Sequence, residues 1–203
     1  MDRVTEIQRR GGVASLRFLS GEVVRVPSAV YLERRLRIGD FADPEAYRLF
    51  AAQRGYPHAL EAAMKFLALR ERSEKEVRTR LRRSCFDEGT VQRVVDTLTV
   101  HELLSDRRFA DQWAQSRSRK YGKTRIAQEL KLKGVESGDI KKALDALPEE
   151  EEYQRAVAQG KKLAKKLQGD PQKIARALVR RGYGFSLARR AAEEAAGDQG
   201  AFP

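Results

Sequence analysis

Residues 80–98 read RLRRSCFDEGTVQRVVDTL, and the same pattern returns twice, as ELKLKGVESGDIKKALDAL at 129–147 and ALVRRGYGFSLARRAAEEA at 177–195. The copies lie 49 and 48 residues apart when their first leucines are aligned, which are Leu81, Leu130 and Leu178. A repeat of this length is typical of stacked supersecondary units, which form long, ridged surfaces and not one enclosed pocket. The repeat therefore favours a protein that binds something extended.

Each copy has one position that predicts a chain reversal between two helices. Gly134 and Gly182 occupy it in the second and third copies, and an apolar residue follows each time. Glycine adopts the left-handed conformation that ends a helix, and the next residue then packs back on the last turn. In the first copy this position is Cys85, whose Cβ costs about 1 kcal/mol there. We predict a buried structural thiol, with a redox role as the alternative.

The first 57 residues have a different pattern. Short β-branched runs separated by Gly11-Gly12 and Ser20-Gly21 predict strands at 4–7, 13–18 and 23–26, the last two joined by a two-residue loop. A helix is expected at 29–36. Asp43-Pro44 opens another as N-cap and first helical residue, and Gly55-Tyr56-Pro57 is expected to close it.

From Ala59 onward the pattern predicts only helices, three per copy. Ser73 and Glu76 form a capping box at the start of the second helix of copy one. The predicted fold is mainly α, with three tandem three-helix repeats in a curved, elongated array after a small N-terminal β-hairpin and helix module. The expected divisions are 1–57 for that module, 58–104, 105–148 and 149–197 for the repeats, and 198–203 for a disordered tail.

The basic residues of this chain are concentrated in two segments. The chain has 41 Lys and Arg against 29 Asp and Glu, a net charge of +12. Residues 155–190 hold eleven basic residues and one acidic residue, Asp170, and residues 117–133 hold seven and one, Glu129. Concentrated positive charge binds polyanions through counterion release. The segments therefore favour nucleic acid or an acidic partner, and the alternative is a solubilising helix surface.

These two segments supply the candidate binding residues. In the second repeat they are Arg117, Arg119, Lys120, Lys123, Arg125, Lys131 and Lys133. In the third repeat they are Lys161, Lys162, Lys165, Lys166, Lys173, Arg176, Arg180, Arg181, Arg189 and Arg190. Tyr121 and Tyr183 flank basic residues at helix ends, where they either stack on bases or form half-buried caps.

No constellation of residues predicts catalysis. Gly122-Lys123-Thr124 resembles the end of a phosphate-binding loop, but Arg117 stands where its first glycine belongs and no strand precedes it. His58 and His101 lack neighbours at metal-ligand spacing. We expect no enzyme activity, no metal and no cofactor. No apolar run is long enough to span a bilayer, and a single cysteine fits a reducing cytoplasm, where we expect a monomer.

The stretch 105–135, SDRRFADQWAQSRSRKYGKTRIAQELKLKGV, resembles the central motif of the RecX family of bacterial recombinase regulators. The matching residues are Asp106, Arg108, Phe109, Ala110, Ser116, Arg117, Gly122, Arg125, Ile126, Glu129, Leu130, Lys133 and Gly134. The first repeat carries the family's Arg-Ser-x-x-Glu signature as Arg72, Ser73 and Glu76. The third repeat is more weakly similar. Cys85 in place of glycine and Glu136 in place of a Ser or Asp cap depart from the family pattern.

The resemblance implies a protein that binds the RecA recombinase filament on DNA, within its helical groove, and lowers its strand-exchange, ATPase and coprotease activities. It implies roles in DNA recombination, DNA repair and the SOS response, with single- and double-stranded DNA as further partners. The alternative is a helical DNA-binding protein that acts mainly on DNA itself, because two helices joined by a glycine turn are similar to a helix-turn-helix.

Overall fold

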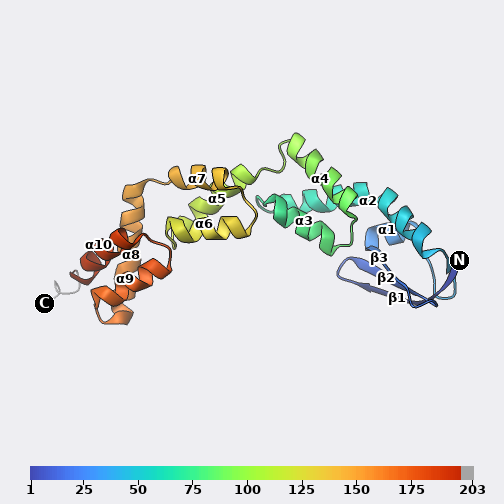
Figure 1. The fold of residues 1–203 in the computed structure, drawn as a ribbon, viewed down its shortest axis with the longest axis horizontal. Coiled ribbons are helices and arrows are strands. Elements are labelled where there is room, and N and C mark those ends of the chain that lie inside the picture. The colour runs from blue at the N-terminus through green and yellow to red at the C-terminus, as the bar shows by residue number, and fades with distance from the viewer. Residues whose placement is uncertain (198–203) are drawn as a thin grey trace. The chain divides into compact units, whose positions relative to one another are not determined.

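The computed structural model describes residues 1–197, which form two compact units, Met1–Ser105 and a second that begins at Asp106. Four strands and ten helices are found in this part of the chain (Figure 1). Each unit has two hydrophobic clusters. The mainly α fold with a small N-terminal strand module is confirmed. The exact domain divisions stay a prediction, and the predicted tail at 198–203 lies outside the described residues.

A four-stranded antiparallel sheet begins the first unit. Its strands are β1 (Asp2–Arg10), β2 (Val13–Phe18), β3 (Val23–Pro27) and β4 (Phe41–Ala42), in the order β3-β2-β1-β4. The turn predicted at Gly11-Gly12 is confirmed and has two residues, since Arg10 pairs with Val13. The loop after β2 is longer than predicted. The Phe18 amide donates to the Glu22 carbonyl, which leaves residues 19–21 as a three-residue loop with Gly21 at a φ of 87°.

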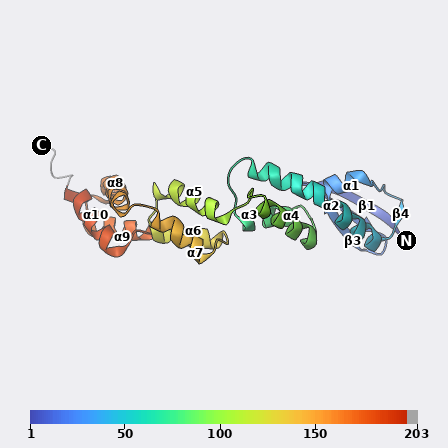
Figure 2. The same cartoon turned by 90° about the horizontal axis from the view of Figure 1, so that it is seen from above.

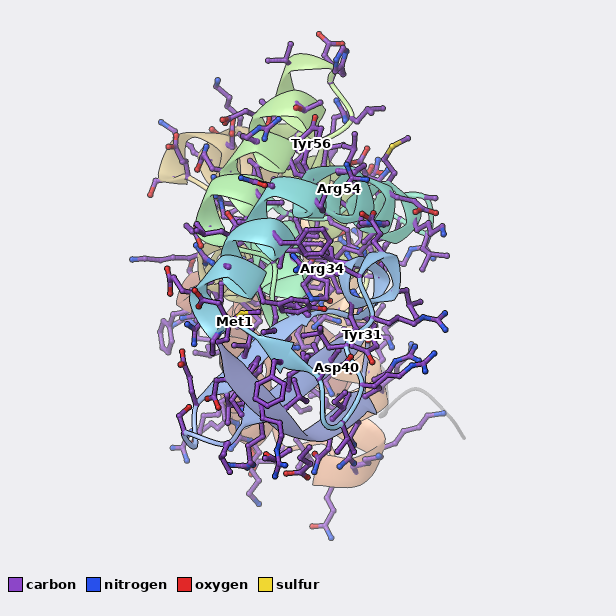
Figure 3. All side chains as sticks on the ribbon, turned by 90° about the vertical axis from the view of Figure 1, so that its right-hand side faces the viewer. Met1, Tyr31, Arg34, Asp40, Arg54 and Tyr56 are labelled. Atoms are coloured by element: carbon purple, nitrogen blue, oxygen red, sulfur yellow. The ribbon has the colours of Figure 1, made fainter. Side chains whose placement is uncertain are left out.

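Two helices lie against this sheet. Helix α1 (Ser28–Glu33) is shorter than predicted, because the chain turns after Arg34 and the Tyr31 hydroxyl donates to the Leu36 carbonyl at 2.9 Å. Figure 3 shows Tyr31 and Arg34 in this region. The Arg34 carbonyl accepts a hydrogen bond of 2.8 Å from the hydroxyl of Tyr47, which lies on the next helix, α2 (Pro44–Leu67).

Helix α2 starts at the predicted cap, where the Asp43 side chain accepts from the amides of Glu45 and Ala46. The prediction that it ends at Gly55–Pro57 is wrong, because the helix continues through Pro57 to Leu67 (Figure 2). Proline inside a helix costs about 3 kcal/mol. Packing offsets this cost, since the small buried residues Gly55, Ala59 and Ala63 pack against the first repeat, which includes α4. A Cβ at Gly55 would lie 3.5 Å from the Thr90 hydroxyl.

Three helical repeats follow, each made of three helices. The first combines the end of α2 with α3 (Glu74–Arg83) and α4 (Glu88–Val100). The second is α5 (Asp106–Ser118), α6 (Lys123–Leu132) and α7 (Ser137–Asp145). The third is α8 (Glu149–Leu167), α9 (Pro171–Arg180) and α10 (Phe185–Gly197). The aligned leucines are 0–1 % exposed, which confirms their place in the cores.

The predicted helix reversal is confirmed in all three repeats. Cys85, Gly134 and Gly182 have φ angles of 61°, 85° and 88°. Each reversal has the two hydrogen bonds of a Schellman motif. In the first repeat the Phe86 amide donates to the Leu81 carbonyl and the Cys85 amide to the Arg82 carbonyl, and the equivalent bonds recur in the other two. The capping box of Ser73 and Glu76 is also present. Glu136, which stands where the family pattern has a Ser or Asp cap, is the N-cap residue of α7 and makes no side-chain capping hydrogen bond.

Repeats two and three are joined by backbone hydrogen bonds. The Gly122 amide donates to the Arg181 carbonyl at 3.0 Å, and the Thr124 amide donates to the Gly182 carbonyl at 3.2 Å. The carboxylate of Glu152, on α8, accepts from the Lys123 amide at 3.1 Å. The first amides of α6, which lack a capping side chain of their own, are thus satisfied by the third repeat. A Cβ on Gly122 would lie 2.3 Å from the Gly182 oxygen, so only glycine allows this approach.

Candidate partner-binding surface

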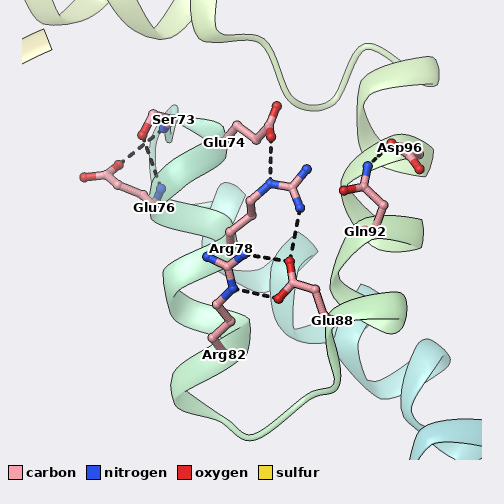
Figure 4. Close-up of polar contacts among 8 residues, drawn as sticks. All are labelled: Ser73, Glu74, Glu76, Arg78, Arg82, Glu88, Gln92 and Asp96. Carbon is pink, nitrogen blue, oxygen red and sulfur yellow. Dashed lines mark hydrogen bonds and ion pairs between the residues drawn. The ribbon is translucent and has the colours of Figure 1, made fainter. Parts of the chain in front are cut away.

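In the first repeat, two arginines of α3 are paired with carboxylates of the same repeat. Glu74 and Glu88 hold Arg78 through contacts of 2.7 and 3.8 Å, and Glu88 holds Arg82 through two hydrogen bonds of 2.6 and 2.8 Å (Figure 4). These arginines join α3 to the start of α4. The mixed charge of this repeat therefore serves packing between its own helices and leaves fewer cations for a partner.

In the second repeat, one carboxylate organises several of the predicted binding residues. Glu129, on α6, accepts two hydrogen bonds of 2.8 and 2.7 Å from Arg117, one of 3.1 Å from the Trp113 indole and one of 3.4 Å from Arg125. Its side chain is only 13 % exposed. The hydrogen bonds from Arg117 lower the pKa of Glu129, and those same bonds raise the pKa of Arg117. The cluster remains ionised over a wide pH range and fastens α5 to α6.

Aromatic rings surround this cluster. The Arg117 guanidinium lies 4.4 Å from the centre of the Tyr121 ring, and the Lys133 ammonium lies 4.2 Å from that of Trp113. Such cation–π contacts fix the position of charges and rings together. Tyr121 is half-buried beneath Arg117, which fits the interpretation as a packed helix end better than a free stacking platform. A binding role for Arg117 and Arg125 stays a prediction, and both also have a structural role.

The remaining candidates of the second repeat have more exposed side chains. Arg119 and Lys120 follow the end of α5, and Lys131 lies on the outer face of α6; all three are exposed. The Lys123 ammonium is 3.9 Å from the Glu152 carboxylate, within the junction between repeats two and three. The Arg119 carbonyl also accepts from Gln159 of α8. The exposed cations Arg119 and Lys120 thus lie next to the hydrogen-bonded junction between repeats two and three, which holds their backbone in place.

In the third repeat, the candidates occupy three different places. Four exposed lysines lie along α8: Lys161, Lys162, Lys165 and Lys166. Arg181 donates to the Gln159 amide oxygen at 2.6 Å, Lys173 pairs with Asp170 at 3.2 Å, and Arg190 lies 4.9 Å from the centre of the Tyr153 ring. The structure does not bring these groups into one cluster. The last three candidates, Arg176, Arg180 and Arg189, gather around a groove.

This groove runs between α9 and α10 and has a volume of about 670 Å³. Its apolar lining residues, here named the floor, are Pro171, Ala175, Val179 and Phe185, while Gln172 and Glu193 complete the lining. Phe185 is 74 % exposed and Val179 is 40 % exposed. Arg176 and Arg180 have no ion-pair partner among residues 1–197, and Arg189 lies 3.7 Å from the Glu193 carboxylate. Exposed apolar surface bordered by charge is typical of an interaction site.

Val179 and Phe185 were missed by the sequence reasoning, although α9 carries a signal for them. Gln172, Ala175, Arg176, Val179 and Arg180 are spaced as i, i+3, i+4, i+7 and i+8, which places them on one helix face. The core face consists of other residues, Ile174, Ala177 and Leu178. This short helix therefore has a second, partly apolar face in addition to the buried one.

Tyr183 is buried more deeply than the half-buried cap that was expected. Its side chain is 2 % exposed and belongs to the core of the third repeat, and burial raises its pKa. It is not available to stack on bases. Phe109 and Phe86 are also buried. The thiol of Cys85 is half-buried and not buried as predicted, because its residue lies at the partly exposed turn between α3 and α4. No group of three or more His, Cys, Asp or Glu suited to a metal occurs in residues 1–197. None of the described helices has the length and apolarity needed to cross a bilayer.

Comparisons with known proteins agree with these observations. The family described as "RecX, first three-helix domain" matches residues 59–98, and "RecX, second three-helix domain" matches residues 105–144. The chain is 36 % identical to the "Regulatory protein RecX" of Mycolicibacterium smegmatis over 141 residues, 64 % of this chain and 75 % of that protein. It is 25 % identical to the protein of that name from Clostridium botulinum strain Alaska E43, over 94 % and 93 % of the two chains.

Solved structures show the same fold. A crystal structure titled as regulatory protein RecX matches 96 % of this chain and all of its own, with a TM-score of 0.65 at 22 % identity. The crystal structure of RecX from Lactobacillus salivarius matches 69 % of this chain and 96 % of its own, with a TM-score of 0.63 at 21 % identity.

Proposed function

The chain belongs to the RecX family of regulatory proteins, and on this basis we propose that it binds the RecA recombinase filament on DNA and inhibits its strand-exchange, ATPase and coprotease activities. The proposed role is non-enzymatic and cytoplasmic, in DNA recombination, DNA repair and the SOS response, and needs no cofactor. The proposed acting species is a monomer, and its repeats lie along the filament's helical groove.

The charge distribution among the repeats is the observation that carries this proposal. In the first repeat the described carboxylates hold Arg78 and Arg82, whereas the third repeat has a single acid, Asp170, between residues 155 and 190. Its lysines and arginines are mostly exposed. A filament of recombinase on DNA presents phosphates and protein carboxylates along its length, and a row of exposed cations is complementary to both.

Binding to DNA itself is the second candidate function. It is favoured by α8, where four exposed lysines lie along two consecutive turns of one helix. Such a helix surface neutralises phosphates without reading base sequence. Comparing binding to bare DNA with binding to RecA-coated DNA at matched salt separates the two. Tighter binding to the coated DNA supports the filament, and equal or weaker binding supports DNA.

The functional test is the ATPase activity of RecA on single-stranded DNA, titrated with this chain. We expect inhibition that saturates, and loss of that inhibition when Lys162, Lys166, Arg176 and Arg180 are changed to glutamate. Inhibition at low ratios of chain to RecA indicates capping of filament growth, and inhibition near equal ratios indicates coating of the groove. ATPase activity that stays unchanged at equal concentrations of chain and RecA would contradict the proposal.

A further inference from the structure

We propose that the groove between α9 and α10 is a docking site for an acidic amphipathic helix of a partner protein. The two helices pack side by side with α8 in both views of the second unit (Figures 1 and 2). The inference adds a binding site for a protein helix to the proposed filament binding. It holds whichever protein supplies that helix.

The shape of the groove favours a helix as its occupant. On α9 the lining residues recur every three to four positions, and on α10 Phe185, Arg189 and Glu193 are spaced four apart. Both walls are therefore straight helical stripes. Helix α9, with ten residues, is about 15 Å long, which matches roughly three turns of a partner helix. Helix-in-groove recognition uses apolar anchors at such a spacing.

The apolar floor distinguishes a protein segment from nucleic acid. Phe185 and Val179 are the large hydrophobic side chains of the floor, and both are exposed to solvent. Binding to single strands relies on several aromatic faces, whereas Phe185 is the single aromatic residue that lines the groove. Apolar side chains of a partner would be buried on this floor, which phosphates and sugars would leave uncovered.

The rim sets the charge of the partner. Arg176 and Arg180 lie one turn apart on α9, and Arg189 lines the same groove from α10. Between residues 171 and 192 the sequence has six basic residues and no acidic one. Glu193 is the one carboxylate of the lining and lies 3.7 Å from Arg189. An occupant with carboxylates on both flanks of its apolar stripe would supply partners for Arg176 and Arg180.

The proposal is tested by fluorescence anisotropy with the full chain and a labelled three-turn synthetic peptide. The peptide carries leucines at positions i, i+3, i+4 and i+7 with glutamates on both sides. A second peptide has the same composition in scrambled order, and a third has lysines in place of the glutamates. We expect the first to bind at least about tenfold more tightly than either of the others, because it alone combines an apolar stripe with the complementary charge.

Two pairs of substitutions with equal charge change provide the control. R176E/R180E alters the rim, whereas K173E/R190E alters cations of the same helices that do not line the groove. We expect the first pair, and Phe185→Ser alone, to weaken peptide binding at least about tenfold, and the second pair to change it less than about twofold. Circular dichroism checks that each variant is folded. Equal losses of peptide affinity for the two pairs would show that net charge alone causes the effect, and would overturn the proposal.

Other occupants give distinct results. Displacement of the peptide by oligothymidine with the same dependence on Phe185 would assign the groove to nucleic acid. Self-association of the chain in sedimentation, abolished by Phe185→Ser, would assign it to a second copy. Failure of the acidic amphipathic peptide to bind at its highest soluble concentration would also overturn the proposal. None of these measurements contains RecA, so their outcome is independent of filament inhibition.

Discussion

Replacing Gly122 by alanine should disrupt the backbone junction between the second and third repeats. The added Cβ would lie 2.3 Å from the carbonyl oxygen of Gly182 and 2.5 Å from the Tyr183 nitrogen. Both are backbone atoms within a Schellman motif, so they cannot move aside as a flexible side chain would. Relief of the clash requires separation of the two repeats at this point.

The magnitude follows from the hydrogen bonds that separation removes. Two backbone hydrogen bonds are broken, Gly122 to Arg181 and Thr124 to Gly182, and the bond from the Lys123 amide to Glu152 is strained. An unmade buried hydrogen bond costs about 1–3 kcal/mol. The smaller conformational freedom of unfolded alanine returns about 0.4–1 kcal/mol. We therefore expect the free energy of unfolding of the second unit to fall by about 1–5 kcal/mol.

Urea denaturation followed by tryptophan fluorescence measures this change, because Trp113 is the single tryptophan of the chain and lies in the second repeat. Gly184→Ala is the matched control. It lies two residues beyond Gly182, has open space at its Cβ position and has no positive φ. We expect the control to change stability by less than about 1 kcal/mol. Equal effects of the two substitutions, or a loss below about 1 kcal/mol for Gly122→Ala, would refute the role assigned to the junction.

Three further predictions concern individual residues. Cys85→Gly should raise the free energy of unfolding by up to about 1 kcal/mol, because glycine adopts a φ of 61° without strain. Cys85→Val should lower it by at least as much, because a β-branched residue is poorly suited to that φ. Calorimetry measures both changes, and the reverse order of stability would contradict the strained turn. Glu129 has a lowered pKa in the folded chain, so its contribution to stability is complete above its unfolded pKa of about 4.3 and is lost as the pH falls through the folded pKa. Urea midpoints should therefore drop more steeply on acidification in the original chain than in Glu129→Gln, and parallel curves would exclude this role. Leu130→Ala should cost about 2–5 kcal/mol in the same denaturation assay, since Leu130 is fully buried, and a loss below about 1 kcal/mol would exclude its place in the core.

The features predicted correctly from the sequence depend on neighbouring residues. Asp43, Ser73 and Gly182 act on amides or carbonyls within a few positions, so their types alone indicate a cap or a reversal. The continuation of α2 through Pro57 could not be predicted in this way, because contacts with α4, distant in sequence, outweigh the local cost of proline.

The candidate surface could be predicted only in part, because contacts between residues distant in sequence also determine it. Clusters of lysine and arginine are visible in the sequence, but their pairing is not. Arg117 donates a hydrogen bond to Glu129, twelve residues further along the chain, and Arg181 at the end of α9 donates one to Gln159 on α8. The groove exists because α9 and α10 pack together, and it gives exposed Val179 and Phe185 a shared surface with Arg176. Periodicity on α9 indicates a second face, while only the packed helices show that it lines a groove.

Binding to RecA-coated single-stranded DNA, measured across a range of salt concentrations, tests the central claim most directly. The original chain is compared with K162E/K166E/R176E/R180E in the third repeat and with a control that has four exposed cations of the first unit reversed, Lys65, Arg80, Arg83 and Arg93. We expect the third-repeat variant to bind more weakly, with a logarithmic salt slope smaller by about 0.7 for each phosphate that is no longer neutralised, and the control to keep most of the original slope. An unchanged slope in the third-repeat variant, or an equal decrease in the control, would contradict the claim that the third repeat forms the charged interface with the filament.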